Sequence, residues 1–185
     1  VPDSEQWYFF GLPFAVKRIT DTSGKELAIG TGDNDGYAIA YYNGVTRASN
    51  GSGGWTDITT APTAEAPLST GGYIFWVNDA KVQDKTLILE SDANSITVSN
   101  STTSSVEYFT GNAGDIHQGW NLITNPLFST ATATLETGQF HYAYNYSDDS
   151  YTVSDNSVTD LKPFDSFFVK TAAEKESVSF TSATT

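Results

Sequence analysis

The sequence contains no cysteine and few basic residues, and these absences exclude several kinds of protein. Its 185 residues include 9 lysines and arginines against 22 aspartates and glutamates, which gives a formal net charge of −13. Without cysteine the chain forms neither a disulfide framework nor a thiolate metal site. The negative charge opposes binding to nucleic acid or to an anionic membrane surface, both of which attract clustered lysine and arginine. The chain also lacks an apolar run long enough to span a bilayer, so we expect no membrane insertion.

Aromatic side chains, in contrast, are abundant. The chain contains 4 Trp, 10 Tyr and 11 Phe. A sequence with so many large apolar rings does not stay solvated and disordered. A chain of this length buries roughly 70% of its unfolded surface when it folds. We therefore expect a folded protein with a substantial hydrophobic core.

Two segments of the chain resemble each other. Residues 7–13 (WYFFGLP) and 120–126 (WNLITNP) each run from a tryptophan through two adjacent apolar residues to a proline. Further segments correspond in the same order, namely 36–42 with 138–144, 68–75 with 161–168, and 86–89 with 177–180. Repetition on this scale indicates that the same structural unit occurs twice along the chain. We predict a first repeat at 1–92, a connecting segment at 93–118 and a second repeat at 119–185, all within a single domain 1–185.

Local patterns in the first repeat favour strands. Residues 6–12 are rich in the aromatic side chains that suit a pleated sheet. Asn43-Gly44 separates apolar runs at 37–42 and 45–48. This dipeptide is a strong signal for a type I′ hairpin, because both residues tolerate positive φ angles. We therefore predict a hairpin of two strands at this turn.

The second repeat predicts a similar arrangement. Residues 140–146 lead through a polar turn into 151–153, and 166–170 (SFFVK) is a short apolar run. Between the repeats, 100–105 (NSTTSS) predicts either a long hairpin tip or the joint between the halves. Many short strands punctuated by Gly, Pro, Asn and Asp are typical of all-β folds. We predict a jelly-roll-like β-sandwich whose two sequence-related halves, with pseudo-twofold symmetry, bury their apolar faces against each other.

The chain also resembles a known kind of module. The motifs W-N-L-x-x-N-P at 120–126 and P-F-x-x-F-F-V at 163–169 resemble the repeated β-modules of secreted and surface proteins from Bacteroidetes-type bacteria. In those proteins the module lies beside leucine-rich repeats, glycan-degrading enzymes or adhesion domains. The first repeat departs from the pattern, since Leu12 stands where the second has Asn125. The resemblance implies a secreted or cell-surface location, neighbouring domains in a larger polypeptide and a non-catalytic role.

Motifs for catalysis are missing. The sequence has no G-x-S-x-G elbow for a nucleophilic serine, and its two histidines, His117 and His141, do not complete a zinc site by themselves. We therefore expect no enzymatic activity and no required cofactor. Asp33 and Asp35 alternate with Asn34 ahead of a glycine, as in part of a calcium loop, although the loop's first acid and closing glutamate are missing. Both aspartates are candidate calcium ligands, with a plain polar turn as the alternative.

Trp55 differs from the other tryptophans because it lies in a polar context, between a Gly/Ser loop and Asp57. A sugar binds with its C–H groups against an aromatic face and its hydroxyls against polar side chains. The predicted site consists of Trp55 and Tyr42 as the stacking surface, Asp57 and Arg47 as hydroxyl partners, and Tyr146 and Tyr151 beside the corresponding turn. The alternative for Trp55 is that it covers the edge of the core.

Two functions of different classes follow from these features. The first is a non-catalytic extracellular module that binds a polysaccharide or other glycan. The second is a structural or adhesion module of a larger surface protein, with no small-molecule ligand. A glycan site predicts that Trp55 and its neighbouring tyrosines are exposed in one strip. A structural module predicts that these rings are buried and that an apolar patch lies elsewhere for a partner domain.

Overall fold

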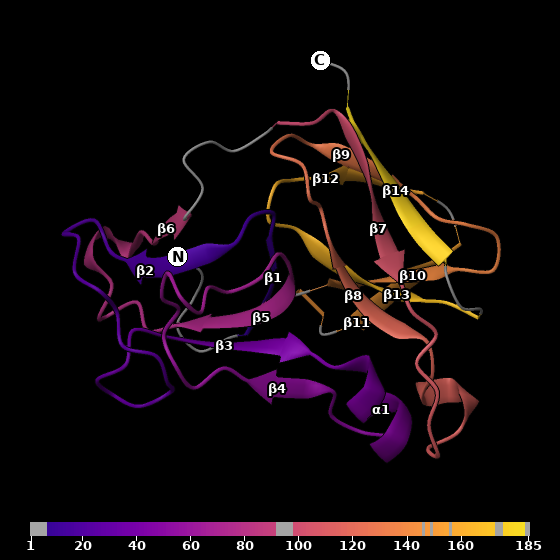
Figure 1. Cartoon of the computed structure of the whole chain (residues 1–185), viewed down its shortest axis with the longest axis horizontal. Coiled ribbons are helices and arrows are strands. Elements are labelled where there is room, and N and C mark those ends of the chain that lie inside the picture. Colours follow the sequence, from indigo (N-terminus) through magenta and orange to yellow (C-terminus); the bar gives the residue numbers. More distant parts are fainter. Residues whose placement is uncertain are drawn as a thin grey trace.

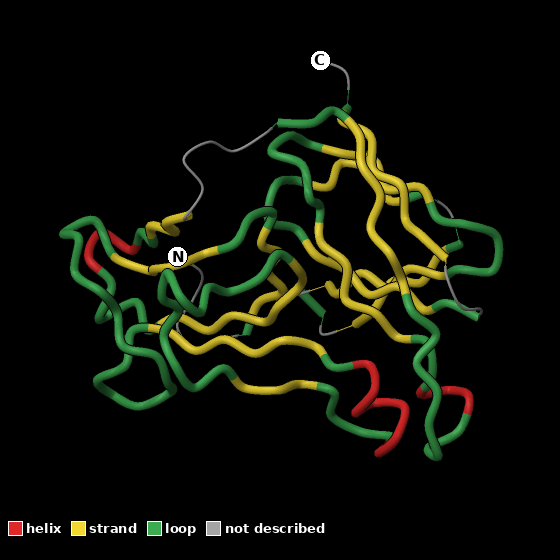
Figure 2. The backbone as a smooth tube through the Cα atoms, in the orientation of Figure 1, coloured by secondary structure: helices red, strands yellow, loops and turns green. Residues whose placement is uncertain are grey.

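The structure, a computed structural model, describes residues 7–91, 98–145, 147–148, 150–155, 157–172 and 176–183. Strands dominate these residues, and the expected all-β class is confirmed (Figures 1 and 2). The strands are β1 (Tyr8–Leu12), β2 (Val16–Thr20), β3 (Tyr37–Tyr42), β4 (Trp55–Asp57), β5 (Gly71–Val77), β6 (Ile88–Ser91), β7 (Ser101–Val106), β8 (Trp120–Thr124), β9 (Ala131–Thr134), β10 (Phe140–Asn145), β11 (Ser150–Ser154), β12 (Val158–Leu161), β13 (Ser166–Lys170) and β14 (Glu176–Ser182). The helical segments are α1 (Gly44–Asn50), η1 (Gln83–Lys85) and η2 (Asp115–His117).

Each repeat contributes strands to two antiparallel sheets. In the first repeat β1-β5-β3-β4 form one sheet and β2-β6 the other. The second repeat forms the sheet β8-β13-β10-β11 and supplies three strands of the sheet β7-β14-β9-β12, whose edge strand β7 comes from the connecting segment 93–118. Strands with corresponding sequences, such as β1 and β8, occupy the same position in their sheets. In Figure 1 the indigo-to-magenta strands of the first repeat lie on the left and the orange-to-yellow strands of the second lie on the right.

The strand ladders correct one detail of the sequence comparison. Tyr8 pairs with Phe75, whereas Asn121, which corresponds to Tyr8, pairs with Val169. Phe75 therefore corresponds to Val169 and not to Phe168. A shift of one residue matters, because it moves a side chain to the other face of the sheet. Phe75 and Val169 both lie in hydrophobic cores, which leaves Phe168 on the opposite face of β13.

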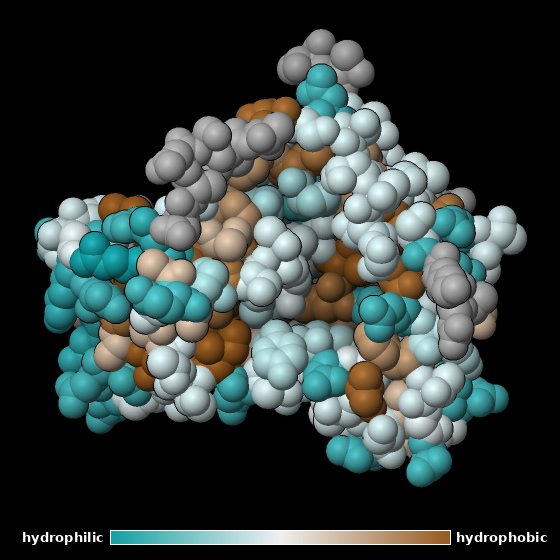
Figure 3. All heavy atoms as spheres, viewed as in Figure 1, coloured by the Kyte–Doolittle hydropathy of each residue, from teal (hydrophilic) through white to brown (hydrophobic). Residues whose placement is uncertain are grey.

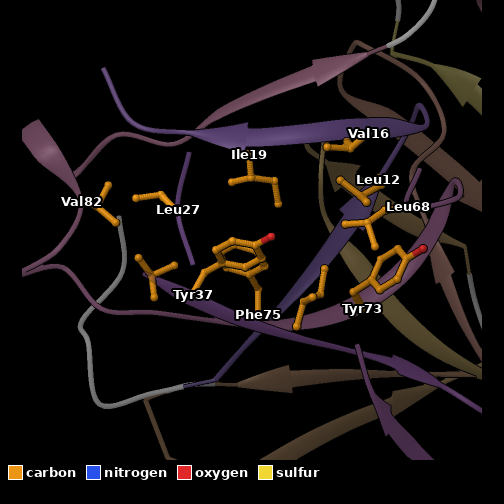
Figure 4. Close-up of a cluster of buried hydrophobic side chains, with 11 residues drawn as sticks. Leu12, Val16, Ile19, Leu27, Tyr37, Leu68, Tyr73, Phe75 and Val82 are labelled. Carbon is orange, nitrogen blue, oxygen red and sulfur yellow. The ribbon is translucent and has the colours of Figure 1, made fainter. Parts of the chain in front are cut away.

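The buried hydrophobic side chains form two clusters, one in each repeat. In Figure 4 Val16 and Ile19 of β2 lie over Tyr37 and Phe75 of the facing sheet. The second cluster joins side chains such as Phe167 and Phe180 in the same manner. We expected the halves to bury their apolar faces in one common core. Instead each repeat closes a core of its own, because its second sheet covers the apolar face of its first.

Tyr37 carries a polar atom into the first core. The side chain is fully buried, and its hydroxyl has no hydrogen-bond partner among the described residues. Burial raises the pKa of this phenol far above its usual range. A buried hydroxyl without a partner costs about 1–3 kcal/mol. Tyr37→Phe is therefore expected to raise the free energy of unfolding by about 1 kcal/mol, measured by urea denaturation. A lower free energy of unfolding in the variant would contradict the assignment.

The predicted Asn43-Gly44 hairpin is wrong, because these residues begin helix α1. The Asn43 side chain accepts a hydrogen bond from Thr46 N at 3.0 Å and so caps the helix, which ends at Gly51 with φ 75°. Asparagine suits a helix cap as well as a turn. Ala48 is fully buried in the middle of the helix. The strand expected at 45–48 is thus helical, and β3 pairs with β4 instead.

The segment 100–105, expected as a hairpin tip or joint, largely forms β7. This strand pairs with β14 in the second repeat. Its serines and threonines are mostly exposed, so the polar composition reflects an exposed edge strand rather than a loop. The hairpin expected around the second polar turn is confirmed, with Tyr144 opposite Tyr151 in β10 and β11.

Candidate functional site

A hollow of about 370 Å³ opens where the two repeats meet, a volume within the roughly 300–1,000 Å³ of ligand pockets. We call it the aromatic hollow. Its lining comprises Tyr42, Arg47, Gly53 and Trp55 from the first repeat and Trp120, Tyr142, Tyr151, Val153 and Phe168 from the second. Six of these nine residues are aromatic. In Figure 3 brown, hydrophobic atoms appear in a recess near the centre of the face shown, whereas tyrosines and tryptophans are pale on the hydropathy scale, so the colour does not pick out the rings of the hollow.

Phe168 connects the rings at the bottom of the hollow. This side chain is only 7% exposed. Its ring centre lies 4.7 Å from that of Tyr42, 6.0 Å from Trp55 and 5.9 Å from Trp120, all in edge-to-face geometry. Such geometry is favourable because the positive edge of one ring meets the negative face of another. The wall of the hollow is therefore rigid and drawn from both repeats.

Two equivalent pairs of rings flank the junction. Tyr42 lies opposite Trp55 in the β3-β4 ladder, and Tyr144 lies opposite Tyr151 in the β10-β11 ladder. The ring centres are 5.3 Å apart in the first pair and 5.1 Å in the second. Phe9 of β1 contacts one ring of each pair, Trp55 at 6.2 Å and Tyr144 at 5.6 Å. Corresponding positions in the β3-β4 and β10-β11 strand pairs therefore each carry a pair of aromatic residues.

Two cations approach the Trp120 ring. The Arg47 guanidinium carbon lies 6.0 Å from the ring centre, and Lys170 Nζ lies 5.6 Å from it. These distances are typical of cation–π contacts. The indole N–H of Trp120 donates to the carbonyl of Ile116 at 2.8 Å, which fixes the ring's orientation. Positive charge from both repeats therefore gathers at this wall.

Helix α1 places Arg47 at the junction of the two repeats. A Cβ at Gly44 would lie 2.6 Å from the carbonyl oxygen of Trp120, so the helix begins in direct contact with the second repeat. A Cβ at Gly54 would lie 2.8 Å from Tyr42 and 3.3 Å from Arg47. These glycines permit an approach that larger residues would block. The position of Arg47 thus depends on close packing on both sides.

The phenol of Tyr42 has a clearly shifted pKa. Burial raises the pKa of this phenol to about 12, with Tyr151 adding to the rise and the Arg47 charge opposing it. The hydroxyl is therefore neutral at physiological pH. It serves as a hydrogen-bond donor or acceptor rather than as a base.

The structure brings four of the six predicted site residues together. Trp55, Tyr42, Arg47 and Tyr151 all line the hollow. Asp57 is exposed two residues beyond Trp55 on β4 and does not belong to the lining. Tyr146 lies outside the described residues.

Three aromatic lining residues escaped prediction. Trp120 and Phe168 lie in apolar runs, which favour core positions, and Tyr142 lies within the expected strand 140–146 without a distinguishing polar context. The missed signal is the alternation in β13, where Phe167 and Val169 are core residues. A large ring between them at Phe168 must lie on the opposite face.

The candidate calcium loop shows a different arrangement. Asp35 turns back on its own loop and accepts a hydrogen bond from Gly32 N at 2.8 Å. Within the described ranges, no group of three or more histidine, aspartate or glutamate side chains is placed to hold a metal ion. The same part of the chain contains no helix with the length and hydrophobicity to cross a membrane.

Three further hollows in the described part of the chain compare with this one. One of about 600 Å³ is lined mainly by the loop at 66–72 and contains no charged side chain. Another, of about 510 Å³, is a mostly apolar groove around Phe10, Phe14 and Phe164. The groove also contains Lys85, whose ammonium group is paired with Asp79 at 3.0 Å.

A third hollow, of about 390 Å³, contains Lys170 beside aromatic rings, but the Asp115 carboxylate lines it as well. Of these four hollows, the aromatic hollow combines rings with a cation that belongs to no ion pair among the described residues, and its lining contains no carboxylate. The aromatic hollow is therefore the best candidate for recognising a polar ligand.

Comparison with known proteins does not add to this description. No protein-family model, no curated protein and no solved structure matches the chain.

Proposed function

We propose that this chain is a non-catalytic, extracellular carbohydrate-binding module that holds a glycan in the aromatic hollow. The observation that carries the proposal is the combination of partly exposed rings with one guanidinium that approaches the Trp120 ring. Trp55 is half-buried and Tyr151 is 49% exposed, so ring surface remains open to a ligand. A sugar presents both C–H faces and hydroxyls, which such a surface satisfies together.

The chemistry of the lining supports binding rather than hydrolysis. Glycoside hydrolysis uses a pair of carboxyl groups flanking the bond that breaks. The described lining offers tyrosine hydroxyls and a guanidinium, but neither a carboxylate nor an imidazole. A sugar held there meets hydrogen-bond partners without an acid–base pair.

We propose in addition that the fold is a β-sandwich built from two sequence-related halves with pseudo-twofold symmetry. The matching strand orders support this proposal. So does the contact between Gly11 and Thr124, which are corresponding residues: a Cβ at Gly11 would overlap the Thr124 side chain. Residues near a twofold axis meet their own counterparts in this way.

Affinity electrophoresis tests the proposed function. The protein is run through gels that contain plant and host polysaccharides, with and without calcium. We expect retardation on at least one gel, and Trp55→Ala should bind that polysaccharide at least about tenfold more weakly, because a buried aromatic contact carries much of a binding energy. Trp7→Ala is the control, since Trp7 is 38% exposed and lies outside the hollow. Equal loss in both variants would contradict the site.

A structural or adhesion module remains the second candidate. The observation that favours it is the apolar groove around Phe10, Phe14 and Phe164, which has the character of a contact surface for a neighbouring domain. The resemblance to modules of larger surface proteins points the same way. No retardation on any gel would favour this function over carbohydrate binding.

A further inference from the structure

The charges around the aromatic hollow distinguish between classes of glycan. The chain has 9 lysines and arginines, and two of them, Arg47 and Lys170, approach the Trp120 ring. The ion pairs among the described residues join Arg18 to Glu26 and Glu90, and Lys85 to Asp79. Arg47 and Lys170 belong to none of these pairs. Neither cation therefore forms an ion pair with a carboxylate in the part of the chain described, although Asp115 lines the same hollow as Lys170.

Arg47 also has an unused donor. Its Nε atom is buried and makes no hydrogen bond within the described residues. A buried N–H without an acceptor is unusual and calls for an explanation. Arg47 as a whole is half-buried and lines the hollow, so a ligand in the hollow contacts its side chain, and a movement of that side chain would bring the buried Nε within reach of the ligand.

The lining is rich in donors and poor in acceptors. Arginine only donates, and so does the indole N–H of Trp55, whereas the N–H of Trp120 already donates to the carbonyl of Ile116. Within the described lining, the side-chain acceptors are the hydroxyls of Tyr42, Tyr142 and Tyr151. A neutral sugar has many hydroxyls that donate, and it is commonly held by carboxylates and amides that accept. A carboxylate only accepts, and it matches the fork of a guanidinium with two parallel hydrogen bonds.

We propose that the glycan bound in the aromatic hollow is acidic, a uronic-acid saccharide whose carboxylate pairs with Arg47. This inference rests on the proposed carbohydrate-binding function and specifies its ligand. The sugar ring lies against Trp55 and Tyr151, and Lys170 adds positive charge behind Trp120. The net charge of −13 repels a polyanion from the rest of the surface, so an acidic glycan binds only where this local positive charge overcomes that repulsion.

Isothermal titration tests the inference with matched ligands. The probes are short oligomers of galacturonate, mannuronate and hyaluronan, each compared with its own carboxyl methyl ester at one fixed ionic strength. The ester keeps the sugar and removes the charge. We expect at least one acid to bind about tenfold more tightly than its ester, the effect of one charge-assisted bidentate contact. This comparison uses the unaltered protein, so it does not depend on the folding of a variant.

Substitutions then assign the charge preference to Arg47. Arg47→Gln should reduce the difference between acid and ester to less than about twofold, whereas Arg47→Lys should retain part of it. Lys25→Gln removes the same charge from an exposed position outside the hollow and should leave the difference unchanged. An acid preference that persists in Arg47→Gln overturns the role of Arg47.

Failure of the inference and failure of the proposed function give different results. Equal binding of acid and ester, or Trp55-dependent binding to neutral glycans alone, overturns the acidic ligand and leaves carbohydrate binding intact. Absence of binding to all three acids and to neutral oligomers of glucose, xylose and mannose overturns both.

Discussion

Asn125→Leu is expected to lower the free energy of unfolding by about 3–5 kcal/mol, a large part of the ~5–15 kcal/mol that stabilises a typical domain. Asn125 is completely buried. Its side-chain amide donates to the carbonyls of Ser129 and Leu161, each at 3.0 Å, and its oxygen accepts from Leu127 N at 2.9 Å. Leucine has a similar volume but leaves these three backbone groups unpaired inside the protein, and each unpaired group is costly.

Urea denaturation followed by circular dichroism measures the effect. Asn112→Leu is the matched control, because Asn112 is exposed, and its substitution should change the free energy of unfolding by less than about 0.5 kcal/mol. Similar losses in the two variants would show that the buried hydrogen bonds of Asn125 are not what stabilises the protein. The first repeat carries Leu12 at the corresponding position, so the asparagine serves the loop after β8 and not the fold of the repeat in general.

Phe168→Ala is expected to lower the free energy of unfolding by about 3–5 kcal/mol and also to abolish glycan binding. The Phe168 ring contacts four other aromatic rings, and its removal takes this common contact away from all of them. The four are Phe9, Tyr42, Trp55 and Trp120. The cavity that remains lies directly beneath the aromatic hollow. The rings that face a ligand then lose the packing that fixes their orientation.

Phe167→Ala is the informative comparison for this prediction. Phe167 is adjacent in β13 but belongs to the core of the second repeat and is 2% exposed. Its loss should destabilise the protein by a similar amount and leave binding within about threefold at temperatures where the variant is folded. Near-ultraviolet circular dichroism and affinity electrophoresis on both variants separate the two effects. If folded Phe168→Ala binds as tightly as the unaltered protein, the hollow is not the glycan site.

The sequence predicted those parts of the structure that depend on local composition. The strand around Ser166 follows from a short apolar run, and the β10-β11 hairpin follows from a polar turn between two aromatic runs. Helix α1 was missed because Asn-Gly is equally suited to a tight turn and to the start of a helix. The choice between them depends on contacts distant in sequence. One is the close approach of Gly111 to the backbone of Ala48, where a Cβ at Gly111 would lie 2.6 Å from Ser49 N.

The candidate site was predicted on one side only. Trp55 was recognised because it is an aromatic residue in a polar stretch, which local sequence reveals. The opposite wall, with Trp120 and Phe168, comes from runs that read as core in isolation. Whether Trp120 and Phe168 line the hollow depends on how the two repeats meet, and no local sequence pattern encodes that contact.

The presence of two separate cores has a consequence for the order in which the molecule assembles. Each repeat contains the side chains that close its own core, so each has the means to become compact before it contacts the other. The aromatic hollow forms only when these two compact units dock. We therefore expect the capacity to bind a ligand to appear last during refolding, and to disappear first under mild denaturation while the secondary structure is still intact. A bound glycan that contacts both walls of the hollow stabilises the docked arrangement of the two repeats relative to the separated arrangement.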